Sequence, residues 1–142
     1  MERLKKCLSD KEVECIDEIK SDLIKLGFEP TSKCLSYLTG CIFYAVMDER
    51  KLGKMTSVLL PEVALVYNVK TISLQNTCRH RMDEVYYNTA FKKLNEVVGF
   101  DYIRPYEKPS LNNFISTLAQ KYILKYHTSI PFNKEEDNSI SI

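Results

Sequence analysis

Apolar residues recur every three or four positions along most of the chain. This spacing is typical of one buried face of an α-helix, and no stretch of any length shows the alternation of a β-strand. Three helix starts have a residue expected to act as a cap. They are Ser9, Thr31 or Ser32, and Ser110, and the segment after Ser9 resembles a capping box. The pattern predicts an all-α domain with helices over Ser9–Leu26, Thr31–Met47, Met55–Leu59, Pro61–Tyr67, Ile72–Tyr87, Ala90–Val97 and Leu111–Tyr126.

Glycine and proline set several of these boundaries. Gly27 and Gly99 are expected to end helices, because glycine readily adopts the left-handed conformation found there. Pro61 allows two interpretations: a helix that begins near Leu60 with Pro61 in its first turn, or two short helices divided at this point. We favour the division.

The segment around Ala64 and Asn68 predicts a tight turn between two helices. A helix-turn-helix needs a small residue where its helices approach most closely, and Ala64 fits that need. It then needs a residue that tolerates the left-handed conformation, and asparagine is the best choice after glycine. We therefore expect a helix-turn-helix from about Pro61 to Tyr86.

The second helix of this motif has two different faces. Thr71 or Ser73 is expected to cap it, since each carries a side-chain oxygen. Its apolar stripe consists of Leu74, Cys78, Met82 and Val85. Its polar face consists of Ser73, Asn76, Arg79, His80 and Asp83.

Charge is concentrated in the same part of the chain. The whole sequence has a formal net charge of only +1. Between Arg50 and Arg81, however, six basic residues stand against Glu62 alone. A local basic excess is typical of a surface that contacts phosphates, although a run of charge can also be a solvated helix face. Together with the predicted turn, it favours DNA.

Several segments resemble one family in order and spacing. They are L-G-F-E-P (Leu26–Pro30), K-L-G-K-M-T-S-V-L-L-P-E-V-A-L-V-Y-N (Lys51–Asn68), C-R-H-R-M (Cys78–Met82), V-G-F (Val98–Phe100) and K-P-S-L-N-N-F-I (Lys108–Ile115). The family is the DNA-binding effector domain of stage 0 sporulation protein A, the sporulation response regulator of Firmicutes. The resemblance spans roughly Leu26 to Tyr122.

The resemblance implies a transcriptional regulator that binds double-stranded DNA. The family's Arg-His pair, which contacts phosphates, corresponds to Arg79 and His80. Its base-reading positions are typically rich in arginine and glutamate, but here they are Ser73, Gln75 and Asn76, which predicts the same docking on a different DNA sequence. Further phosphate contacts are expected from Lys54, Lys70, Lys92 and Lys93.

Length and composition suit one modest globular domain. The 142 residues are 44% hydrophobic and leave no room for the receiver domain that precedes the effector domain in full-length family members. We expect an amphipathic helix over residues 1–25, the DNA-binding domain over 26–127 and a disordered acidic tail over 128–142. The amphipathic helix would either join two copies of the chain in a homodimer or pack on its own domain.

No sequence feature predicts catalysis, a metal or a cofactor. The five cysteines form no C-x-x-C pair, the two histidines lie far apart, and no nucleotide-binding or hydrolase motif occurs. Reduced cysteines packed as small apolar residues are expected. The chain also lacks a signal peptide or an apolar run long enough to span a membrane, so we expect a cytoplasmic protein without a membrane partner or a small-molecule substrate.

A second class of function competes with DNA binding. The chain could be a protein-interaction module that antagonises a receiver-bearing relative without binding DNA itself. Exposure of Lys70, Arg79 and His80 together would favour DNA. An exposed apolar patch around Ile72 would favour the interaction module.

Overall fold

The computed structural model describes residues 8–100 and 107–126. Within these ranges every regular element is helical, which confirms the predicted all-α class. The elements are α2 (Asp10–Leu26), α3 (Lys33–Met47), a 3₁₀ helix (Glu49–Lys54), a π-helix (Met55–Leu59), α4 (Leu60–Val66), α5 (Thr71–Thr89), α6 (Leu94–Val98) and α7 (Leu111–Tyr126). The expected acidic tail falls outside the described residues.

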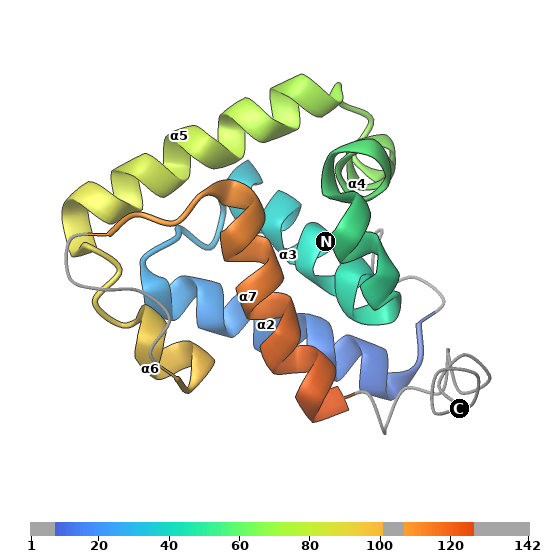
Figure 1. Ribbon diagram of the computed structural model, residues 1–142, viewed down its shortest axis with the longest axis horizontal. Coiled ribbons are helices and arrows are strands. Elements are labelled where there is room, and N and C mark those ends of the chain that lie inside the picture. Colours follow the sequence, from blue (N-terminus) through green and yellow to red (C-terminus); the bar gives the residue numbers. More distant parts are fainter. Residues whose placement is uncertain (1–7, 101–106, 127–142) are drawn as a thin grey trace.

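Helix α3 runs through the middle of the molecule, with α2, α4, α5 and α7 packed around it (Figure 1). Its sequence explains this position, because Lys33 is the one charged residue among its fifteen. A helix that is apolar on nearly all sides is stable only when it is surrounded by other elements. Ser32 caps α3, and its Oγ accepts a hydrogen bond from the Leu35 N–H at 3.2 Å.

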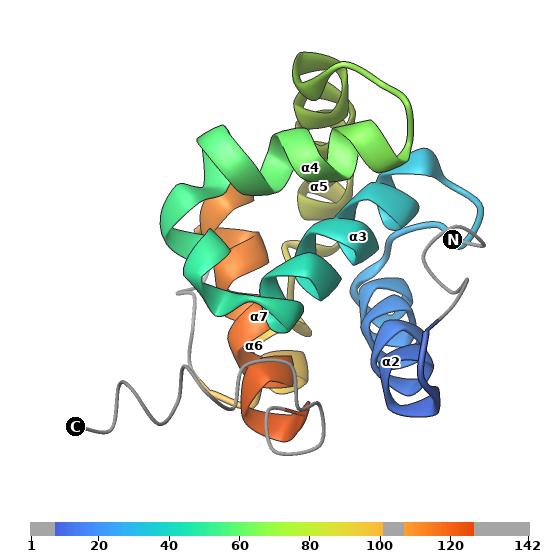
Figure 2. The same cartoon turned by 90° about the vertical axis from the view of Figure 1, so that its right-hand side faces the viewer.

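Helix α5 lies along an outer edge of the molecule in Figure 1 and is seen nearly end-on, behind α4, in Figure 2. One side of it packs on α3, α4 and α7, and its other side faces solvent. This helix is the longest of those described, with 19 residues, and only Leu74, Cys78, Met82 and Val85 are buried in it.

Helix α2 has the boundaries that its sequence predicts. The side chains and N–H groups of Ser9 and Glu12 bond reciprocally in a capping box, and Gly27 ends the helix in the left-handed conformation with φ 116°. Its apolar stripe, which includes Ile16, Ile19 and Leu23, is fully buried, and α2 packs against α3, α6 and α7. Any assembly through α2 would have to use its exposed side.

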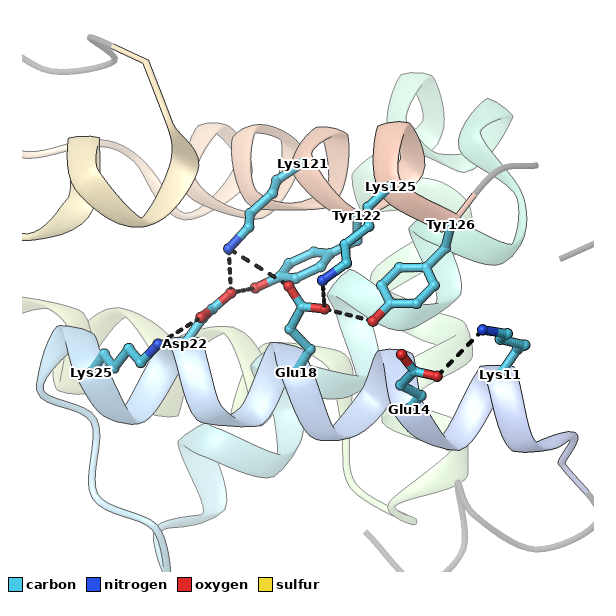
Figure 3. A network of polar contacts seen from close by, with 9 residues as sticks. All are labelled: Lys11, Glu14, Glu18, Asp22, Lys25, Lys121, Tyr122, Lys125 and Tyr126. Carbon is cyan, nitrogen blue, oxygen red and sulfur yellow. Dashed lines mark hydrogen bonds and ion pairs between the residues drawn. The ribbon is translucent and has the colours of Figure 1, made fainter. Parts of the chain in front are cut away.

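A network of polar contacts joins α2 to α7 (Figure 3). Asp22 is only 5% exposed, and its Oδ2 accepts hydrogen bonds from the Tyr122 hydroxyl and, at 2.6 Å, from the Lys121 ammonium. One turn away, Glu18 Oε1 accepts hydrogen bonds from Lys125 at 2.7 Å and from Tyr126 at 2.5 Å. Buried polar groups are tolerated only when they are paired in this way, so the network fixes how α7 docks on α2.

The network gives stability a dependence on pH. Burial alone would raise the pKa of Glu18, but hydrogen bonds from Lys125 and Tyr126 outweigh it and hold the pKa below its ordinary value of 4.5. Because the folded-state pKa is depressed, the stabilisation is present above pH 4.5 and is lost as the pH falls through the folded-state value. Glu18→Gln should therefore flatten the acid-side fall in unfolding free energy, measured by urea titration at several pH values below 4.5. Glu14→Gln, on the exposed side of α2, is the control, and an unchanged slope in Glu18→Gln would contradict the expectation.

The end of α5 differs from the sequence prediction. The helix continues to Thr89, and the separate helix predicted over Ala90–Val97 is present only in its second half, because Ala90 and Phe91 adopt left-handed backbone conformations with φ 52° and 49°. The reason is packing, because this reversal places the Phe91 ring in the core, stacked on Phe114 with ring centroids 5.6 Å apart. Helix α6 starts only at Leu94, and Gly99 follows its last residue as a left-handed C-cap, as predicted.

The cysteines in the described residues pack as small apolar side chains. Cys15, Cys34, Cys41 and Cys78 are all buried free thiols, and burial raises the pKa of Cys15 to about 12. Within the described part of the chain, no group of three or more histidine, cysteine, aspartate or glutamate side chains is placed to hold a metal ion. In the same residues, no single helix has both the length and the apolar character needed to cross a membrane.

Candidate nucleic-acid interface

Helices α4 and α5 are joined by a short turn and meet at a large angle. The predicted division at Pro61 is present: a π-helix over Met55–Leu59 precedes α4, whose first turn contains Pro61. The segment Glu49–Val66 and helix α5 are bent by 92° across the turn Tyr67–Lys70. This angle and turn length are those of a helix-turn-helix.

Local hydrogen bonds and one long-range contact hold the turn. Asn68 has the left-handed conformation that the sequence predicts, with φ 55°, and the Val69 N–H donates to the Ala64 carbonyl at 3.0 Å. Ala64 itself is buried. The Tyr67 hydroxyl donates to the Ser36 carbonyl on α3 at 3.1 Å, which fastens the turn to the central helix.

The beginning of α5 differs from the prediction that Thr71 or Ser73 caps it. Lys70 occupies the N-cap position, Thr71 is the first helical residue, and no side chain among the described residues bonds to the helix start as a cap. The helix also has no acidic residue in its first turn. Its first N–H groups and the positive end of its dipole are therefore left available to an anion.

The two faces of α5 are arranged as the sequence predicts. Leu74, Cys78, Met82 and Val85 are buried. Ser73, Asn76, Arg79 and His80 are exposed, whereas Gln75 is half-buried at the flank of the apolar stripe. Ile72, which was expected to be exposed only if the protein is an interaction module, is 55% exposed beside Ser73.

Pairing within the protein reduces the local basic excess. Three basic side chains form salt bridges: Arg50 with Asp48 at 3.0 Å, Lys51 with Glu62 at 2.6 Å, and Arg81 with Glu84 at 3.3 Å. Other basic side chains form no ion pair with any of the described residues, and all of them are exposed. They include Lys54, Lys70, Arg79, Lys92 and Lys93. The side chain of His80 is 76% exposed and lies 3.5 Å from Glu84.

A pocket of about 270 Å³ lies between the middle of α5 and the start of α7. Arg79 and Lys108 line it, and so do the first residues of α7, which Ser110 caps by accepting a hydrogen bond from the Asn113 N–H at 3.2 Å. Lys108 pairs with Asp83 across the pocket, and this hydrogen bond raises the pKa of Lys108. Lys108 is not among the predicted contact residues, because 25 residues separate it from Asp83 and only the tertiary fold brings them together.

The predicted contact residues are not all gathered in one place. Ser73, Asn76 and Arg79 lie in the first half of α5. Lys92 and Lys93 follow its far end, and a helix of 19 residues is about 27 Å long. Lys54 is exposed in the segment before α4. The structure therefore separates a compact central set from outlying lysines.

Residues 19–122 match the protein family described as sporulation initiation factor Spo0A C terminal. The chain belongs to this family. The match runs from the middle of α2 to α7 and contains the whole α4–α5 unit, in agreement with the resemblance of the individual motifs. The family is one of DNA-binding regulatory domains and is not an enzyme family.

Proposed function

We propose that this protein is a sequence-specific transcriptional regulator whose α5 enters the major groove of double-stranded DNA. The observation that carries the proposal is the α4–α5 unit, with its 92° bend, its uncapped α5 start and the exposed cations Lys70 and Arg79. In helix-turn-helix proteins the first residues of the second helix contact base edges while the first helix crosses the backbone. Family membership supports the same conclusion.

The proposal gives the exposed residues two different roles. Base edges are assigned to Ser73, Gln75 and Asn76, of which Gln75 is the least accessible. Phosphates are assigned to Lys70, Arg79 and His80 in the centre, and to Lys54, Lys92 and Lys93 farther out. Lys108 lines the same pocket as Arg79 beside the N-terminus of α7, but its ion pair with Asp83 leaves it out of the phosphate set.

Substitutions of phosphate-contacting residues and of base-reading residues should change DNA affinity in two different ways. Arg79→Ala should weaken binding to all duplexes alike and lower the slope of log K against log salt by about one unit. Asn76→Ala and Gln75→Ala should instead cost roughly 1–3 kcal/mol on the preferred site and little on random DNA. Fluorescence anisotropy on both duplexes, at several salt concentrations, measures the two effects.

A matched control for this experiment lies on the same helix. Arg81→Ala removes an equal charge, but Arg81 is paired with Glu84 and lines a different pocket, with Gly27 and Glu29. It should change the salt slope by much less than Arg79→Ala. Equal losses on preferred and random DNA for Asn76→Ala and Gln75→Ala would remove these two amides from the base-reading set.

One observation favours the second candidate, a protein-interaction module that antagonises a receiver-bearing relative. Leu65, in the last turns of α4, is 80% exposed, and Ile72 is exposed on the other side of the turn. A mobility shift on random duplex DNA at low and moderate salt distinguishes the candidates. A shift that weakens with salt supports the regulator, and no shift at low salt supports the interaction module.

The proposal includes a cytoplasmic location, where bacterial DNA lies, and a homodimer that contacts two half-sites. Deletion of α2 is not a suitable test of the dimer, because Ile16, Ile19 and Leu23 belong to the core of the domain. Light scattering on the full chain, with substitutions on the exposed side of α2, is the appropriate measurement.

A further inference from the structure

One exposed row of side chains on α5 begins with an apolar residue. Ile72, Asn76 and His80 are spaced by four residues, so they lie on one face of the helix, one turn after another. All three are exposed. Ile72 is the first of this row, in the turn of α5 that carries no cap and no acidic residue.

The core does not explain Ile72. Leu74 and Cys78 fill the interface beneath this part of α5 and are fully buried, while Ile72 points away from them at 55% exposure. The groups around it are polar or cationic: Lys70 precedes it, and Asn76 and Arg79 follow on the exposed part of the helix. An apolar side chain framed by cations and an amide matches the floor of the DNA major groove, which offers an apolar 5-methyl group only at thymine.

We infer that Ile72 contacts the 5-methyl group of a thymine next to an adenine that Asn76 reads. Asparagine can bond bidentately to adenine N6 and N7. Side chains four residues apart on a helix have β-carbons about 5–6 Å apart, and base pairs are stacked about 3.4 Å apart. The two contacts therefore fall on base pairs one or two steps apart, and the preferred site contains a thymine and an adenine at that spacing. This inference rests on the proposed function, and it adds a specificity residue and a base composition to it.

Replacing thymine by deoxyuridine tests the contact directly, because deoxyuridine pairs with adenine in the same way and lacks only the 5-methyl group. The full chain is first used to select a preferred duplex from a random library. Each thymine in that duplex is then replaced in turn, and affinity is measured by anisotropy. Wild-type protein should lose about fourfold in affinity at one thymine, the factor expected for one buried methyl group.

A double-mutant cycle assigns that loss to one side chain. Ile72→Ala should bind the thymine duplex several-fold more weakly than wild type and lose nothing further when the same thymine is replaced. The matched control is Leu65→Ala, which truncates a more exposed apolar side chain on α4. It should keep the full sensitivity to deoxyuridine. Circular dichroism confirms that both variants keep their helix content.

The outcomes separate this inference from the function on which it rests. Specific binding by wild type that is insensitive to every deoxyuridine replacement overturns the role of Ile72 and leaves the regulator intact. Deoxyuridine sensitivity that persists in Ile72→Ala assigns the methyl contact to another residue and also overturns the inference. Failure of wild type to bind any duplex overturns both.

Discussion

Phe114→Ala should lower the free energy of unfolding by about 3–5 kcal/mol, the largest effect we expect from one substitution. Phe114 is fully buried, and its ring stacks on Phe91 at 5.6 Å and packs against Phe28 at 5.9 Å. These three rings join α7 to the turn after α5 and to the loop after α2. Truncation leaves a cavity where the three segments meet, and close-packed surroundings collapse only partly. Urea unfolding and the melting temperature, which should fall by more than about 10 °C, measure the effect.

Phe100→Ala is the matched control for this substitution. Phe100 is 49% exposed, so its truncation should change the unfolding free energy by less than about 1 kcal/mol. If the two variants were destabilised equally, the aromatic cluster would not be the joint between α7 and the rest of the fold. The cluster also bears on function, because it holds the end of α5 opposite to the proposed base-reading residues.

The second large effect should come from Asp22→Ala. The Asp22 carboxylate accepts hydrogen bonds from Tyr122 and Lys121, and burial, together with the hydrogen bond to Asp22, raises the pKa of the Tyr122 hydroxyl, which stays protonated as a donor. Removing the carboxylate leaves the buried Tyr122 hydroxyl without its acceptor, and the half-buried Lys121 ammonium keeps only Glu18, at 3.9 Å. The expected loss is roughly 2–4 kcal/mol, somewhat less than for a fully buried ion pair, because Lys121 can turn toward solvent.

Glu14→Ala controls for the loss of a carboxylate on the same helix. Glu14 pairs with Lys11 at 3.6 Å, and both side chains are more than half exposed, so the loss should be below about 0.5 kcal/mol. Tyr122→Phe removes only the buried hydroxyl and should fall between the two. An Asp22→Ala variant as stable as Glu14→Ala would show that the network in Figure 3 adds nothing to the docking of α7.

Helix boundaries set by local chemistry could be predicted from the sequence. The capping box at Ser9, the left-handed stops at Gly27 and Asn68, and the division at Pro61 all depend on neighbours within four or five residues. The buried stripe of α5 follows from helical spacing for the same reason. These features depend on the local sequence and not on where the segment lies in the fold.

Two predictions of local structure were wrong, and a distant contact accounts for the second of them. Thr71 and Ser73 have the side chains of good caps, yet α5 begins one residue too early for Thr71, and three residues too early for Ser73, to occupy the N-cap position, which Lys70 takes. Ala90 and Phe91 were predicted to lie in a helix. Both instead take left-handed conformations, and the Phe91 ring thereby reaches Phe28 and Phe114. Burial of one aromatic ring can offset the strain of this reversal.

The sequence by itself determined the helical class, the turn between α4 and α5, and the division of α5 into an apolar and a polar face. Only the tertiary structure decided which basic side chains have no ion pair among the described residues, because pairing also depends on residues farther apart in the chain, such as Lys51 with Glu62. It also placed Lys108 beside Arg79 and left Ile72 exposed at the start of α5. The physical reason is range: caps, turns and helical faces come from neighbours along the chain, whereas burial and ion pairing depend on all the segments that pack together.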